Sequence, residues 1–131
     1  KIINTGQRPL TIDLDFLPFP ARHLLPYKKY FSGVSGKQFI TTMMTSRGCP
    51  FNCLFCYTKN RVFRARSPDN VIQEIKQLQQ RYNIKEAAFW DDVFTLNRKW
   101  VLDLLNSMEK DLFEPNFYKL LESIFNINFC K

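Results

Sequence analysis

The chain has 131 residues and a formal net charge of +7, with Lys and Arg spread along the sequence, so we expect no nucleic-acid partner. Apolar residues make up 45% of the chain and aromatic residues 15%, which is enough to bury a core and excludes a disordered composition. No stretch approaches the roughly 18 apolar residues of a membrane-spanning helix.

The first part of the chain, residues 1–37, reads as a linker. Four residues interrupt any long regular element there: Pro9, Pro18, Pro20 and Pro26. A single helical turn is expected over 21–25. Because the sequence begins on Lys1 and ends on Lys131 without a capping signal, we expect it to be a piece of a longer protein.

Strand and helix patterns alternate after the linker. Residues 38–45 are rich in strand formers and predict a buried strand, and residues 46–66 are expected to form one long loop. Ser67 as N-cap and Pro68 at the first helical position then begin a helix, on which Glu74 is expected as a surface charge. The apolar face and the end of this helix are marked by Val71, Ile75, Leu78, Tyr82 and Asn83.

A second strand and helix follow. Residues 87–90 predict a strand that ends on Asp91 and Asp92, and Asn97 is placed to cap the next helix. The apolar stripe of that helix is Val101, Leu104, Leu105, Met108 and Leu112. The remaining sequence predicts a further helical piece and the start of a third strand, over 117–125 and 127–130.

The alternation of strands and helices predicts an α/β fold with parallel strands. In such sheets, ligands bind where the strands reach their carboxyl ends. The loop 46–66 follows the first strand, and Asp91 and Asp92 follow the second. We therefore expect them to lie at the same edge of the sheet.

Three cysteines lie within eight residues of the long loop: Cys49, Cys53 and Cys56, with the spacing C-x3-C-x2-C. A tetrahedral zinc site needs four ligands and disulfides need pairs, whereas three thiolates suit a cubane iron–sulfur cluster with one iron left open. We expect the three sulfurs to converge. Free cysteines at this spacing also indicate a reducing compartment, which predicts the cytoplasm.

Zinc remains an alternative interpretation of this motif. Such a site could use the three cysteines together with either Cys130 or His23 as the fourth ligand. Cys130 alone is expected to be a buried core residue, because free cysteine packs as a small hydrophobe.

The pattern Cys49, Cys53, Phe55, Cys56 resembles the signature of the radical S-adenosylmethionine (radical SAM) enzymes, C-x3-C-x-aromatic-C. Three further segments, together with the proline-rich residues 14–26, resemble the branch of this superfamily that follows a cobalamin-binding domain. These segments are residues 44–50, 64–68 and 89–95.

The resemblance implies a fold and a domain organisation. The expected fold is a partial (βα)6 radical SAM barrel containing about two and a half βα units. Residues 1–37 would link it to a missing N-terminal, cobalamin-binding domain. Residues 38–131 would form the truncated N-terminal part of the radical SAM domain.

The resemblance also implies the cofactors. The three cysteines would hold a 4Fe-4S cluster whose open iron binds S-adenosylmethionine, and Phe55, Asp91 and Asp92 would contact that ligand. A reductant such as flavodoxin or ferredoxin would supply an electron, and cleavage would give a 5′-deoxyadenosyl radical or support cobalamin-dependent methyl transfer. The alternatives are a radical SAM methylthiotransferase, or a non-catalytic iron–sulfur or zinc-binding module. The departure from the superfamily's usual Gly-Gly-Glu stretch at Asp91 leaves open which aspartate touches the ligand, and one of the two could instead cap the turn.

Overall fold

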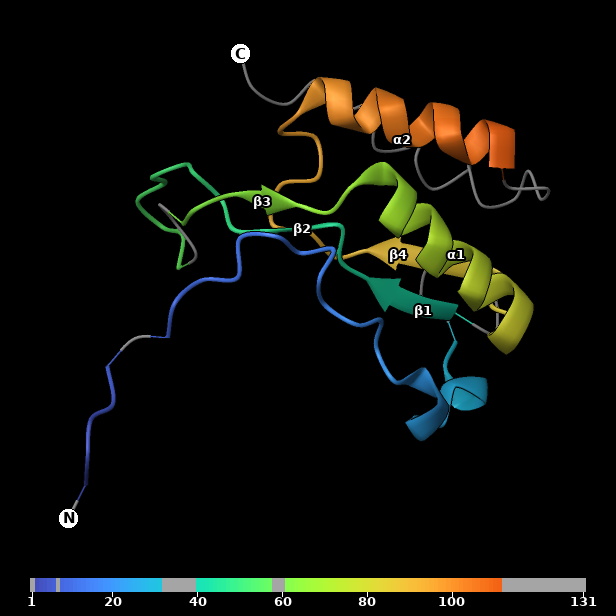
Figure 1. Cartoon of the computed structure of the whole chain (residues 1–131), viewed down its shortest axis with the longest axis horizontal. Coiled ribbons are helices and arrows are strands. Elements are labelled where there is room, and N and C mark those ends of the chain that lie inside the picture. Colours follow the sequence, from blue (N-terminus) through green and yellow to red (C-terminus); the bar gives the residue numbers. More distant parts are fainter. Residues whose placement is uncertain (1, 7, 32–39, 58–60, 112–131) are drawn as a thin grey trace.

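The computed structural model describes residues 2–6, 8–31, 40–57 and 61–111, and the elements below lie within these ranges (Figure 1). The expected helical piece over 117–125, the third strand over 127–130, Leu112 and Cys130 lie outside the described residues. The strands are β1 (Ile40–Met43), β2 (Ser46–Arg47), β3 (Arg64–Ala65) and β4 (Glu86–Phe89). The helices are α1 (Pro68–Tyr82) and α2 (Arg98–Asp111), preceded by 3-10 turns at Arg22–Leu24 and Tyr27–Lys29.

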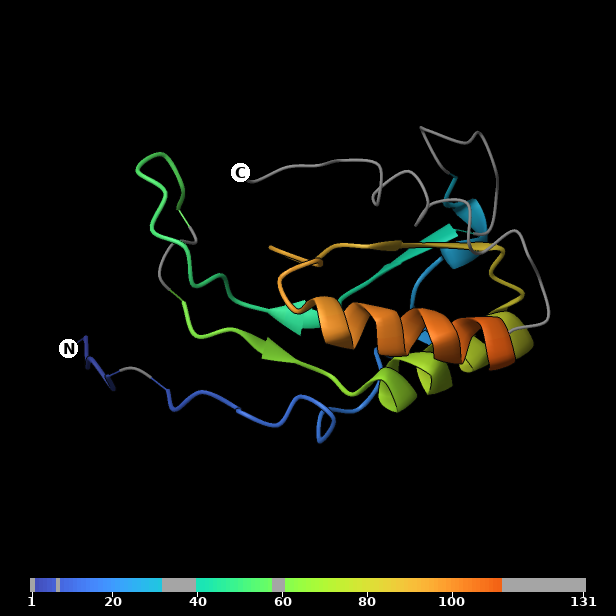
Figure 2. The ribbon, with the colours of Figure 1, turned by 90° about the horizontal axis from the view of Figure 1, so that it is seen from above.

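The centre of the described structure is a parallel pair of strands. β1 pairs with β4 in a register that runs from Ile40 opposite Glu86 to Met43 opposite Phe89. Both helices cover the same face of this pair (Figure 2). The sequence-based prediction of an α/β arrangement with parallel strands is therefore confirmed for the described residues.

A second, antiparallel ribbon was not expected from the sequence. Ser46 pairs with Ala65 and Arg47 pairs with Arg64, so that β2 and β3 form the two sides of a short ribbon. The prediction of a single loop over 46–66 is wrong at its two ends. Strands of two residues carry no readable alternation, so the hydrophobic pattern could not reveal them.

The predicted start and end of α1 are confirmed. The Ser67 hydroxyl accepts a hydrogen bond from the Asn70 N–H at 3.2 Å, which satisfies one of the free donors of the first turn. At the other end, Asn83 adopts the left-handed conformation (φ 53°) and closes the helix. Asn97 caps α2 as expected, because its side-chain oxygen accepts from the Trp100 N–H at 3.1 Å.

The core lies between the two helices and the face of the sheet that they cover. Its side chains come from the apolar faces of α1 and α2, from β1 and β4, and from the connection between α1 and β4: Met43, Val71, Ile72, Ile75, Leu78, Tyr82, Ile84, Ala87, Leu104 and Met108. Four of the five residues expected on the α2 stripe fall within the described residues, and three of those four are buried. No helix in the described part of the chain is long and apolar enough to cross a membrane.

Part of the N-terminal segment packs on this core. Leu14 is buried, Asp15 accepts a hydrogen bond from the Ser67 N–H at 2.9 Å, and the ring of Tyr27 contacts Tyr82 edge-on. The helical turn expected over 21–25 is present as the 3-10 turn at Arg22–Leu24. The stretch from Leu14 to Tyr27 is therefore attached to α1 along its length.

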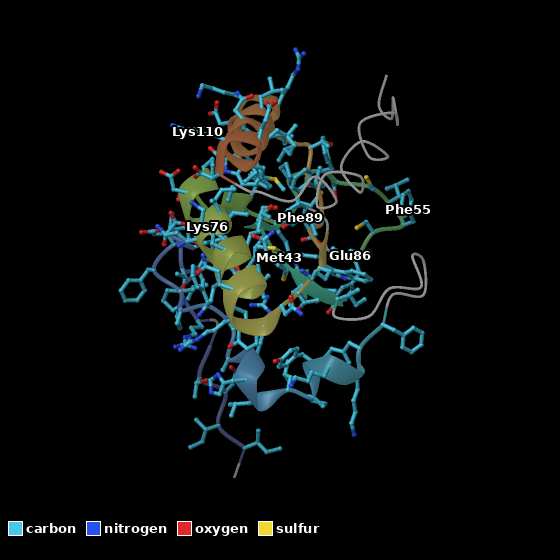
Figure 3. All side chains as sticks on the ribbon, turned by 90° about the vertical axis from the view of Figure 1, so that its right-hand side faces the viewer. Met43, Phe55, Lys76, Glu86, Phe89 and Lys110 are labelled. Atoms are coloured by element: carbon cyan, nitrogen blue, oxygen red, sulfur yellow. The ribbon has the colours of Figure 1, made fainter. Side chains whose placement is uncertain are left out.

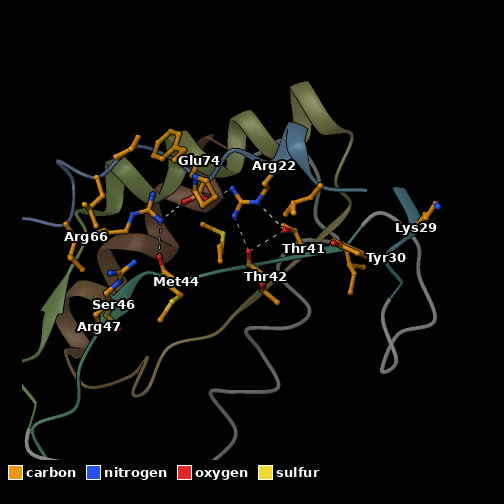
Figure 4. Close-up of a pocket in the computed structure, with 18 of the residues that line it drawn as sticks. Arg22, Lys29, Tyr30, Thr41, Thr42, Met44, Ser46, Arg47, Arg66 and Glu74 are labelled. Carbon is orange, nitrogen blue, oxygen red and sulfur yellow. Dashed lines mark hydrogen bonds and ion pairs between the residues drawn. The ribbon is translucent and has the colours of Figure 1, made fainter. Parts of the chain in front are cut away.

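The strongest attachment is a buried ion network on α1. Glu74 was expected as a surface charge, but it is 2% exposed and lies between two guanidinium groups, so that expectation is wrong. Arg22 approaches it at 2.6 Å and Arg66 at 2.5 Å (Figure 4). Helical periodicity places Glu74 beside Val71, Ile75 and Leu78, and only the two arginines make a charge tolerable there.

The same arginines cover the outer edge of β1. The Met43 carbonyl accepts from the Trp90 N–H, so the carbonyls of Thr42 and Met44 point away from β4. Arg22 donates to the Thr42 carbonyl at 3.1 Å, and Arg66 donates to the Met44 carbonyl at 2.9 Å. These bonds satisfy backbone acceptors that would otherwise offer a template for another strand.

Replacing Glu74 should therefore be costly. In Glu74→Gln the two guanidinium groups lose the buried carboxylate that both of them contact, and we expect the free energy of unfolding to fall by about 3 kcal/mol. Glu109→Gln makes the same chemical change at an exposed site on α2 and should change it by less than about 0.5 kcal/mol. Urea denaturation of the two variants measures the difference, and equal effects would contradict the buried network.

Candidate functional site

The cysteine loop is closed at its base by the β2–β3 ribbon. Gly48 follows β2 with φ +88°, and a Cβ on it would lie 2.2 Å from the carbonyl oxygen of Val62. One residue further on, the Cys49 carbonyl accepts a hydrogen bond from the Arg61 N–H at 2.7 Å. The two sides of the loop approach so closely here that only glycine fits.

Asp91 binds the chain just before this loop. Asp91 follows Trp90, the first residue after β4, and its carboxylate accepts four hydrogen bonds. The N–H and hydroxyl of Thr45 donate at 2.7 and 2.9 Å, and those of Ser46 donate at 2.5 and 3.1 Å. Both carboxylate oxygens are thus engaged by the residues that lead into the cysteine loop.

Asp92 contacts the chain two residues after Ser46, at Gly48. Its Oδ2 accepts from the Gly48 N–H at 3.2 Å, and the residue itself is exposed. The prediction that the cysteine loop and the two aspartates lie at the same edge of the sheet is confirmed by these contacts. The alternative expectation, that one aspartate caps the turn before Asn97, is not borne out, because Asp91 accepts from Thr45 and Ser46 and Asp92 accepts from Gly48.

The three cysteines occupy different environments. Cys49 is buried, Cys53 is exposed and Cys56 is half-buried. The Cys56 N–H donates to the Cys53 carbonyl at 3.1 Å, which makes a turn at the tip of the loop. The thiols are thus carried by one loop that is fixed at its base.

The expected convergence of the three sulfurs is not found. Among the described residues, no three side chains of His, Cys, Asp or Glu are arranged so that they could hold a metal ion. Metal ligation commonly orders such a loop, because the bonds to the metal supply the free energy that draws the thiolates together. The donor set, three cysteine thiols on a single loop, fits an iron–sulfur cluster with three protein ligands.

Large apolar side chains surround the cysteines at the tip of the loop. Phe55 is 93% exposed and projects away from the core residues Met43 and Phe89 (Figure 3). Leu54 and Tyr57 are exposed to a similar degree. Such a cluster of exposed apolar groups marks a surface that is covered by a ligand or by another part of the protein.

A separate pocket lies beside β1. Its volume is about 660 Å³, and the N-terminal segment and β1 form its walls (Figure 4). The Arg22–Glu74–Arg66 network lines one side of it. Ser46 and Arg47, at the start of the loop that carries the cysteines, also line this pocket, whereas none of the three described cysteines does.

Comparison with known families identifies the chain. Residues 43–128 match the model of the radical SAM superfamily, which is 86 of the 131 residues. The chain belongs to the radical SAM superfamily. The matched region contains the three cysteines and both aspartates, and the described part of it is a small α/β structure with two helices and parallel strands.

Several curated proteins are similar to this chain in sequence. An uncharacterized methyltransferase of Pyrococcus horikoshii is 43% identical over 107 residues, which cover 79% of this chain and 23% of the relative. Cytidylyl-2-hydroxyethylphosphonate methyltransferase of Streptomyces wedmorensis is 31% identical, over 75% of this chain and 20% of the relative. Anaerobic magnesium-protoporphyrin IX monomethyl ester cyclase of Cereibacter sphaeroides is 29% identical, over 82% of this chain and 18% of the relative. The chain spans about a fifth of the length of these relatives.

Sequence reasoning missed the residues that support the loop. Thr45 and Ser46 read as the end of a strand and the start of a loop, although both are buried polar residues. Gly48, directly before Cys49, was a usable signal, since glycine at a loop entrance commonly marks a close backbone approach. Arg22 gave no signal, because its partner lies 52 residues later on α1.

Substitution of Gly48 should open the base of the loop. In Gly48→Ala, the positive φ and the contact with the Val62 carbonyl both oppose the new Cβ, and we expect the free energy of unfolding to fall by at least about 1 kcal/mol. Gly6→Ala is the matched control, because Gly6 also has a positive φ (+78°) but nothing lies within 4 Å of its Cβ position.

Urea denaturation and limited proteolysis of the loop are the measurements for this pair. Faster cleavage between residues 50 and 62 in Gly48→Ala alone is the expected result. If the two alanine variants behave alike, the close approach at Gly48 does not hold the loop.

Proposed function

We propose that this chain is the cluster-binding and S-adenosylmethionine-binding part of a longer radical enzyme, of methyltransferase type. The observation that carries the proposal is the loop of three cysteines, fixed by Asp91 and Asp92 at the carboxyl ends of two parallel strands. Ligands of parallel α/β structures bind at this edge. The superfamily membership adds the identity of the cofactor.

In this proposal Cys49, Cys53 and Cys56 hold a 4Fe-4S cluster through their thiolates. When bound, the cluster supplies one electron to S-adenosylmethionine, whose carbon–sulfur bond then breaks to give methionine and a 5′-deoxyadenosyl radical. The residues of the chain bind the ligands and exclude water from them. The exposed apolar tip around Phe55 is suited to that covering role.

Contacts to S-adenosylmethionine are proposed for Phe55 and for Asp92. Phe55 lies between two of the cysteines and presents an exposed ring and backbone to the adenine. Asp92 is exposed, and a carboxylate accepts a strong, charge-assisted hydrogen bond from an ammonium group such as that of the methionine moiety. Asp91, whose oxygens already accept four hydrogen bonds, is proposed to act at the same site from beneath the loop.

Methyl transfer is the proposed outcome because the relatives in Pyrococcus and Streptomyces carry the name methyltransferase. We propose that cobalamin binds to a domain that precedes the linker of residues 1–37, and that residues 38–131 begin a (βα)6 barrel. The two strand–helix pairs of the described residues, β1 with α1 and β4 with α2, support this proposal. A flavodoxin or ferredoxin in the cytoplasm would supply the electron.

Cluster binding is tested by anaerobic reconstitution of the full-length protein with iron and sulfide. We expect a brown protein with about four irons per chain, because three cysteine thiolates hold a cubane cluster. Alanine at any one of Cys49, Cys53 or Cys56 should abolish the absorbance. Cys130→Ala is the control and should retain it, whereas stoichiometric zinc binding that requires Cys130 would favour the structural-metal interpretation.

Turnover is tested on the same loaded protein with a strong reductant and without oxygen. We expect 5′-deoxyadenosine and methionine as products, since the iron without a thiolate is available to the amino and carboxylate groups of S-adenosylmethionine. Methyl transfer adds S-adenosylhomocysteine as a product and requires cobalamin. Products that form equally well without cobalamin would remove the methyltransferase assignment, and the absence of both sets of products would remove the radical chemistry.

A further inference from the structure

We propose that Asp91 is a positioning residue that holds the entrance of the cysteine loop in the conformation that retains the cluster. This inference rests on the proposed function, because it concerns how the same loop holds its iron. It assigns Asp91 a role that acts through the backbone of the loop rather than by contact with S-adenosylmethionine.

The first argument is geometric. The parallel ladder between β1 and β4 makes its last backbone bond where the Trp90 N–H donates to the Met43 carbonyl at 2.8 Å. One residue beyond, the Asp91 side chain takes over the pairing and accepts from the next N–H groups on the opposite side, those of Thr45 and Ser46. The carboxylate therefore continues the strand pairing as far as the start of the cysteine loop.

The second argument is burial. Thr45 is 0% exposed and Ser46 is 3% exposed, so their N–H and hydroxyl groups cannot turn to bulk water instead. All four of these donors reach the same carboxylate. A single acceptor group that satisfies four buried donors leaves the backbone very few alternative conformations.

The third argument is the short path to the first cysteine. Only Arg47 and Gly48 separate Ser46 from Cys49, and Gly48 is itself fixed against Val62 and bound to Asp92. The buried position of Cys49 follows from these restraints, whereas Cys53 lies exposed at the tip. Substitution of residues that orient metal ligands in this way typically lowers metal affinity by roughly 10- to 100-fold.

Asp92 provides the internal contrast. It accepts one hydrogen bond from the loop, at 3.2 Å, against four for Asp91, and it is exposed. Asp91 is therefore assigned to retention of the cluster, and Asp92 to the ligand side of the site. The two roles predict opposite phenotypes for the same chemical change.

The experiment compares Asp91→Asn with Asp92→Asn in the reconstituted full-length protein. An amide offers one acceptor oxygen where the carboxylate has two, so in Asp91→Asn the loss of absorbance to an iron chelator should be about tenfold faster. The affinity of its still-loaded fraction for S-adenosylmethionine should match the wild type. Asp92→Asn should show the reverse, with slow cluster loss and weaker S-adenosylmethionine binding.

A second pair of variants separates positioning from packing. Thr45→Val keeps the shape of the buried side chain but removes the hydroxyl that donates to Asp91, whereas Thr45→Ser keeps the hydroxyl and removes a methyl group. Positioning predicts faster cluster loss, and faster hydrogen exchange at the Ser46 amide of the apo protein, in the valine variant only. A packing role predicts that the serine variant is the more affected, and that result would overturn the inference.

These outcomes distinguish the inference from the proposed function. If the wild-type protein takes up no cluster, the proposed function fails and the inference fails with it. If the wild type holds a cluster and Asp91→Asn retains it equally well, only the inference fails. Should Asp91→Asn not fold, as judged by its helical circular dichroism, the Thr45 pair decides between the two readings.

Discussion

The two central strands run in the same direction, so both of their carboxyl ends open on one edge of the sheet. This is the constraint on which the site depends. It places the residues after β1, which lead to the cysteines, within hydrogen-bonding distance of the residues after β4. An antiparallel pair would have sent the cysteine loop and the aspartates to opposite ends of the sheet, with no contact between them.

The helices supply the stability that keeps the two strands in register. They cover one face of the pair with apolar side chains. Glu74 on α1 forms ion pairs with both of the arginines that bind the outer edge of β1. One of these, Arg22, comes from the N-terminal segment, which is thereby attached to the sheet. The other, Arg66, lies between the β2–β3 ribbon and α1, and it therefore connects the base of the cysteine loop to the core.

The sequence predicted the features that follow from local patterns. Ser67, Asn83 and Asn97 act at helix ends because their side chains or backbone suit those positions, and the helical spacing identified most of the core. The edge shared by the cysteine loop and the aspartates followed from topology alone. The cysteine motif itself indicated the superfamily, which the comparison confirms over residues 43–128.

The features that could not be predicted from the sequence depend on contacts between residues that lie far apart in the chain. The four bonds to Asp91 come from Thr45 and Ser46, which lie more than 40 residues earlier in the chain. No periodic pattern in the sequence reveals such a pairing. Glu74 looked like a surface charge for the same reason, since both of its partners lie outside its helix. The roles of Phe55, Asp91 and Asp92 toward the cofactor stay predictions that rest on the proposed function.

The central claim is that three cysteines of this loop hold a cluster whose remaining iron binds S-adenosylmethionine. The most direct measurement is electron–nuclear double resonance on the reduced, reconstituted full-length protein, with ¹⁵N in the amino group and ¹⁷O in the carboxylate of S-adenosylmethionine. The account predicts hyperfine coupling of both labels to the cluster. A cluster signal without coupling to either label would contradict it, because the ligand would then not be bound to the iron.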